Sequence, residues 1–128
     1  LEKYRCELVD GTLVERALDF AGAMAAQQAM CEVMGYTEGR GSGFCLGPVP
    51  FRLRRGLIRV PSAAFVSWDR VPGRVVPRVQ IGNFAPDLVI EAYNPGHTRA
   101  EFARKLTEYF AAGVRLAWVM DARTQVVQ

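Results

Sequence analysis

Two acidic residues bracket a short apolar segment, Asp87-Leu-Val-Ile-Glu91. This pattern is typical of a central strand whose ends are either functional or solvated. We favour a functional role for Glu91, because a carboxylate at the end of a buried strand needs a cation or hydrogen-bond donors. Asp87 could instead hold the turn that enters the strand. The two acids share a face of the strand, but they lie roughly 13 Å apart at about 3.3 Å per residue, too far to ligate one ion together.

A second group of interest is basic and comprises Arg52, Arg54, Arg55 and Arg59. Arg52 and Arg54 would share one face of a strand, and Arg59 follows the turn at Arg55-Gly56. The group could therefore contact phosphates along a nucleic-acid groove. The alternative is an edge strand protected by charge.

Several other chemistries lack the residues that they require. A single histidine, His97, excludes a two-histidine metal centre, and no GxSxG sequence supplies a serine nucleophile. The cysteines Cys6, Cys31 and Cys45 form no CxxC pair, so neither a zinc site nor a disulfide framework is expected. The glycine-rich residues 39–47 lack the GK[ST] ending of a phosphate-binding loop.

The first half of the chain predicts two hairpins and one helix. Asp10-Gly11 is a hairpin turn between Tyr4–Val9 and Thr12–Glu15. Helix-forming residues from about Ala17 to Met34 follow, with Gly35 as the expected C-cap. The apolar positions expected on this helix are Leu18, Ala21, Ala25, Gln28 or Ala29, and Val33. The turn at Arg55-Gly56 predicts the second hairpin, whose next strand continues through Ala63, Phe65 and Val66.

The second half predicts a β-α-β unit. Thr98 and Glu101 form a capping box at the start of a helix, and Gly113 ends it. Its expected apolar stripe consists of Phe102, Leu106, Tyr109 and Phe110. The segment Val114 to Met120 reads as a buried strand, parallel to the strand at Asp87–Glu91.

Composition limits the class of protein. The chain has 128 residues, a net charge of +3 and no apolar run near the roughly 18 residues of a membrane span. We expect one domain, residues 1–128, that could lack its natural C-terminal end. The expected location is the cytoplasm, with no membrane partner and a mild preference for anionic partners.

Several short sequence segments, together with the order of the predicted elements, resemble the Uma-type restriction endonuclease family. The specific part of the match runs from Pro86 to Asp121. The matching segments are Tyr4–Gly11, Arg59–Ser62, Phe65–Trp68, Pro86–Glu91, Asn94-Pro95, Lys105–Phe110 and Gly113-Val114. The resemblance implies the PD-(D/E)xK nuclease superfamily and an α/β (α+β mixed) fold. Its restriction-endonuclease-like core would be a mixed central sheet with an N-terminal hairpin, flanked by two main helices.

The resemblance also implies Mg²⁺- or Mn²⁺-dependent hydrolysis of DNA. Carboxylates hold the metal, the metal activates water, and a lysine orients the nucleophile. Tyr93 stands two residues after Glu91, where the motif has its lysine, so Lys105 on the next helix is its replacement. Glu91 is then the expected metal ligand, with Asp87 assisting from the far end or Glu7 from the first hairpin.

At Ser62 the sequence departs from the family pattern. The motif aspartate falls on the position after Pro61, and serine is a weak ligand for magnesium. If the strand after Val60 runs antiparallel to the strand after Asp87, position 62 faces Glu91. One alternative is therefore an inactive nuclease-fold module that binds nucleic acid or takes part in assembly, such as a homodimer. Another is a protein-interaction domain with no nucleic-acid role.

Overall fold

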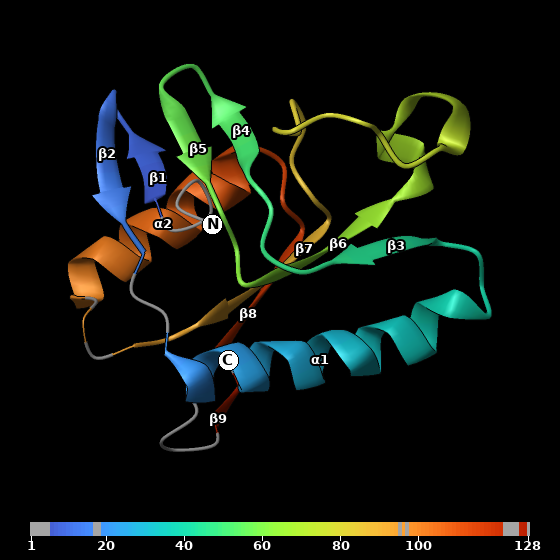
Figure 1. Cartoon of the computed structure of the whole chain (residues 1–128), viewed down its shortest axis with the longest axis horizontal. Helices are drawn as coiled ribbons and strands as arrows, with labels where there is room; N and C mark the ends of the chain where they lie inside the picture. Colours follow the sequence, from blue (N-terminus) through green and yellow to red (C-terminus); the bar gives the residue numbers. More distant parts are fainter. Residues whose placement is uncertain (1–5, 17–18, 95, 97, 122–125, 128) are drawn as a thin grey trace.

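The computed structural model describes residues 6–16, 19–94, 96, 98–121 and 126–127, and within them it contains two β-sheets and two α-helices (Figure 1). One sheet has the strand order β2-β1-β5-β4, and the other has the order β3-β6-β7-β8-β9. The elements are β1 Cys6–Val9, β2 Thr12–Glu15, α1 Phe20–Glu38, β3 Gly43–Leu46, β4 Phe51–Arg54, β5 Leu57–Arg59, β6 Ala63–Ser67, β7 Leu88–Ala92, α2 Arg99–Ala111, β8 Leu116–Asp121 and β9 Val126–Val127.

Both predicted hairpins are confirmed within the described residues. Asp10 and Gly11 have φ angles of 51° and 82°, as a tight two-residue turn between β1 and β2 requires. β4 and β5 pair antiparallel around Gly56. The strand predicted to continue from β5 is instead interrupted, and β6 belongs to the other sheet. The link between β5 and β6 therefore carries the chain from one sheet to the next.

The first helix differs from the sequence prediction at both ends. Asp19 caps it by accepting a hydrogen bond from the Gly22 amide, and the helix continues through Gly35 to Glu38. Its buried face consists of Gly22, Ala26, Ala29 and Val33. The predicted apolar stripe was therefore right at Ala29 and Val33 and one residue too early in the first half of the helix. Residues 17 and 18 lie outside the described part of the chain. A helix can continue through a glycine when its other contacts stabilise it, so Gly35 does not end α1 as predicted.

The second helix begins and ends near the predicted residues. The Thr98–Glu101 capping box is present, and Gly113 follows the helix with φ 105°. The predicted apolar stripe was partly wrong, because Phe110 is half exposed and Lys105 is buried with Phe102 and Tyr109. A charged residue therefore occupies the inward face of α2.

β7 is the central strand of the larger sheet. It pairs antiparallel with β6 and parallel with β8, which confirms the β-α-β unit. The prediction that the second strand is buried was wrong, because β8 is half-buried and its first residue is exposed. Leu88 and Ile90 pack with α1, whereas Val89 packs with Tyr109 of α2. Figure 1 shows α1 along one side of this sheet and α2 behind the β1–β2 hairpin. The mixed α/β class is thus confirmed, and no helix in the described residues is long and apolar enough to cross a membrane.

The course of α1 through Gly35 gives a stability prediction. Gly35→Ala should raise the free energy of unfolding by about 1 kcal/mol, because alanine favours the helix and its Cβ meets no atom within 4 Å. Gly113→Ala is the contrast and should lower stability, because φ is positive there. Urea denaturation measures both. Destabilisation by Gly35→Ala would contradict a helix that continues past this residue.

Candidate active site

Glu91 lies in β7 on the face that packs against α2. Because side chains alternate along a strand, Glu91 shares this face with Val89 and points toward Tyr109. One carboxylate oxygen accepts a hydrogen bond from the Tyr109 hydroxyl at 2.9 Å, and the other contacts Lys105 Nζ at 3.0 Å. The residue is 3% exposed. The predicted pairing of Glu91 with Lys105 is therefore present in the structure.

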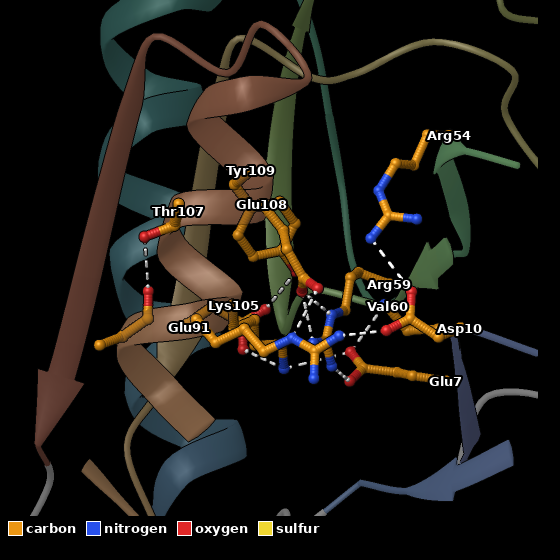
Figure 2. A network of polar contacts seen from close by, with 12 residues as sticks. Glu7, Asp10, Arg54, Arg59, Val60, Glu91, Lys105, Thr107, Glu108 and Tyr109 are labelled. Atoms are coloured by element: carbon orange, nitrogen blue, oxygen red, sulfur yellow. Dashed lines mark hydrogen bonds and ion pairs between the residues drawn. The ribbon is translucent and has the colours of Figure 1, made fainter. Parts of the chain in front are cut away.

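Glu7 of β1 joins the same lysine from the other sheet. Lys105 Nζ lies 3.1 Å from Glu7 Oε1, which also accepts the Val60 backbone N–H at 2.9 Å. Glu7 Oε2 accepts a hydrogen bond from Arg59 at 2.9 Å. Figure 2 shows these side chains converging between α2 and the strands. Lys105 thus bridges two carboxylates that come from different sheets.

Arg59 does not lie with the other arginines of the predicted nucleic-acid surface. Its side chain is 8% exposed and pairs with Glu7 on one side and Glu108 of α2 on the other, with Nε 2.9 Å from Glu108 Oε1. The grouping of Arg59 with an exposed phosphate-binding strand is therefore wrong. Alternation along β5 directs Arg59 inward with Leu57, which is also buried.

The charges of this cluster stabilise one another. Burial alone would raise the pKa of Glu7, but Lys105, the Val60 amide and Arg59 together hold it below its ordinary value. Burial opposes the charged form of Lys105, yet Glu91 and Glu7 raise its pKa. The pKa of Tyr109 is raised well above its usual range by burial and then by the two carboxylates. Lys105 is therefore an ammonium and Tyr109 a neutral donor at neutral pH.

Ser62 lies beside Glu91, as the antiparallel pairing predicted. Ala63 pairs with Ile90 in the register of β6 and β7, and the Ser62 hydroxyl accepts the Ala92 backbone N–H at 3.3 Å. Ser62 is almost completely buried, with 9% of its surface exposed. It therefore supplies a neutral oxygen, already hydrogen-bonded, at the position where the family resemblance implies an aspartate.

The cluster does not fit a magnesium ion as it stands. Each of the four carboxylate oxygens of Glu7 and Glu91 already accepts from a protein N–H or O–H group or contacts Lys105. Within the described residues no three acidic, cysteine or histidine side chains are grouped to hold a metal. Magnesium prefers several unengaged oxygen ligands in octahedral geometry. A metal ion would therefore compete with Lys105 and the other donors for these carboxylate oxygens.

Asp87 is not brought together with Glu91. It lies at the opposite end of β7, where it accepts the Ser67 backbone N–H at 2.7 Å and pairs with Arg70 at 3.1 Å. These contacts fix the entry to the strand, which was the alternative reading of this residue. Asp87 is therefore placed as a turn residue, separate from the cluster.

The remaining predicted arginines are exposed on the β4–β5 hairpin. Arg52 donates to Asn83, Arg54 pairs with Asp10 at 3.1 Å, and Arg55 occupies the turn. These three side chains are accessible to a ligand.

Two members of the cluster were not predicted as site residues, Glu108 and Tyr109. The signal was present in the sequence, because Lys105 lies within the stripe of Phe102 and Tyr109 and a lysine on an apolar stripe needs acidic partners. Glu108 is one helical turn from Lys105, so Glu108 can reach Arg59 while Lys105 reaches Glu7. This spacing does not predict the contacts between distant parts of the chain that complete the cluster, such as those of Arg59 with Glu7 and of Tyr109 with Glu91.

Comparison with known proteins gives a family match and a structural match. A family model named Uma2 and described as "Putative restriction endonuclease" matches residues 1–128. The crystal structure of "a putative nuclease belonging to DUF820" from Anabaena variabilis ATCC 29413 has a TM-score of 0.78, 17% identity, and covers 95% of this chain and 69% of that one. At this identity the likeness shows the fold. No curated protein matches the chain significantly.

Removal of Lys105 should destabilise the protein strongly. Lys105→Met leaves two buried carboxylates facing each other, so the free energy of unfolding should fall by about 3–5 kcal/mol. Arg99→Met, on an exposed position of the same helix, is the control and should change it by less than about 0.5 kcal/mol. A loss below about 1 kcal/mol for Lys105→Met in urea denaturation would contradict a structural role for this lysine.

Glu7 gives a pH prediction with a defined sign. Its folded-state pKa lies below the ordinary 4.5, so its charge stabilises the protein above that pH, and the contribution is lost as the pH falls through the folded value. Glu7→Gln should therefore be less stable than the wild type near neutral pH, and the difference should shrink on acidification. Urea denaturation at several pH values measures this. If the stability difference between the wild type and Glu7→Gln grew as the pH fell below the ordinary pKa, the lowered pKa of Glu7 would be refuted.

Proposed function

The chain belongs to the Uma2 family, described as "Putative restriction endonuclease", and we propose that it is a nuclease-fold domain that binds DNA without hydrolysing it. The observation that carries this proposal is the engagement of Glu7 and Glu91 by Lys105, Arg59 and neighbouring donors, combined with serine at position 62. Residues 1–128 would form this domain as a single unit.

DNA as the ligand is supported by the family and by charge. A net charge of +3 attracts the phosphate backbone, and the exposed Arg52, Arg54 and Arg55 offer contacts that do not depend on the buried cluster. Such contacts bind the backbone of many sequences and weaken as salt rises. Asp87 has no part in this proposal. The cytoplasmic location and the homodimer stay predictions.

A second candidate is a metal-dependent endonuclease. It is favoured by the convergence of Glu7, Glu91 and Lys105, three of the four residues to which the family resemblance assigns catalysis. Under this candidate Mg²⁺ or Mn²⁺ would be the cofactor, and Lys105 would have to leave at least one carboxylate. The two candidates agree on DNA and differ on hydrolysis.

A binding and cleavage assay on three proteins separates the candidates. We expect the wild type to bind duplex DNA in fluorescence anisotropy, with affinity that falls as salt rises, and to cleave none with Mg²⁺ or Mn²⁺. Ser62→Asp restores a carboxylate beside Glu91 and should gain metal binding in calorimetry and cleavage activity. Ser42→Asp, just before β3 and beside the residue that follows the far end of β6, is the control for the added charge and should gain neither.

Metal-dependent cleavage by the wild type that disappears in Glu91→Gln would replace the proposal with the second candidate. Failure of the wild type to bind DNA at low salt would overturn the proposed function itself.

A further inference from the structure

Two arginines from different elements converge on one exposed aspartate. Arg54 at the end of β4 lies with Nη2 3.1 Å from Asp10 Oδ1, and Arg104 of α2 contacts the other carboxylate oxygen. About half of each of these three side chains is exposed. Asp10 stands in the β1–β2 turn, so the contacts join the tips of two hairpins to the helix. Figure 2 shows Arg54 reaching toward Asp10.

This group lies on the solvent side of the buried cluster. Arg104 precedes Lys105 in α2 and also pairs with Glu108 at 3.2 Å. Glu108 in turn accepts from the buried Arg59, so it marks the boundary between the cluster and the surface. A ligand that approaches Glu7 and Lys105 from this side would meet Arg54 and Arg104 first.

The chemistry of the pair suits a phosphodiester. Two guanidinium groups that hold the two oxygens of one carboxylate can hold the two non-bridging oxygens of a backbone phosphate in the same way. Asp10 remains charged because hydrogen bonds from Arg104 and Arg54 keep its pKa below the ordinary value. Water screens exposed ion pairs, so exchange of one anion for another costs little.

We propose that Arg54 and Arg104 form a phosphate-binding clamp for the nucleic-acid backbone, which Asp10 occupies in the free protein and leaves when the phosphate binds. The inference rests on the proposed DNA binding and adds to it a specific contact pair and an internal competitor. It predicts that Asp10 weakens DNA binding in two ways. Its negative charge repels the phosphates, and its carboxylate occupies the clamp.

Asp10→Asn is a suitable test because it preserves the turn. Asp10 has φ 51°, and Asn-Gly is a favoured sequence for this type of hairpin turn. The substitution removes the competing charge while the backbone keeps its conformation. Asp69→Asn removes one exposed acidic charge elsewhere, from a residue that also faces an arginine, Arg74 at 3.6 Å, and is the matched control.

The experiment measures binding of a labelled DNA duplex by fluorescence anisotropy over a range of salt concentrations. Asp10→Asn should tighten binding about two- to fivefold more than Asp69→Asn does. Arg54→Gln and Arg104→Gln should each weaken binding about three- to tenfold and reduce the salt slope by about 1. Arg40→Gln, an exposed arginine that stacks on Tyr36, controls for loss of a positive charge.

Combining Asp10→Asn with loss of both arginines distinguishes release of the clamp from a general effect of charge on binding. In an Arg54→Gln, Arg104→Gln background, Asp10→Asn should bring no more gain than the control substitution, because the groups that it would release are absent. An equal gain in both backgrounds would overturn the clamp. DNA binding that is normal in all clamp variants would overturn the inference and leave the proposed function standing, whereas no binding by any variant would overturn both.

Discussion

The ammonium group of Lys105 connects the two sheets and the second helix. It contacts Glu7 of the first hairpin and Glu91 of the central strand, and both carboxylates are almost completely buried. Burial of two such acids is tolerated only when a cation and hydrogen-bond donors neutralise them. The same contacts that allow this packing occupy the oxygens that a divalent cation would need. Structural stability and metal binding therefore compete for one pair of carboxylates.

The cluster extends to the surface as an alternating series of acids and bases. Each member pairs with the next, and the buried part is stabilised by low exposure while the outer part is open to exchange with ions in solution. The outer part is where a ligand can act without unfolding the core. In order from the surface the series is Arg54, Asp10, Arg104, Glu108, Arg59, Glu7, Lys105 and Glu91.

The sequence predicted the features that depend on local chemistry. The turn at Asp10-Gly11, the Thr98–Glu101 capping box and the central strand at Glu91 are each set by neighbouring residues, and the structure confirms them. Arg59 was misplaced because its partner Glu7 is distant in sequence, and exposure of an arginine on a short strand depends on which face meets another element. The C-terminal end of α1 was predicted too early because Gly35 is compatible both with a helix end and with a helix interior.

The most direct test of the closed cluster is crystallographic. Crystals soaked in Mn²⁺ would show by anomalous diffraction whether a metal binds between Glu7 and Glu91. The account predicts no anomalous peak there and Lys105 Nζ in contact with both carboxylates. A manganese peak coordinated by Glu91, with Lys105 displaced, would contradict it and would restore a metal-dependent nuclease site.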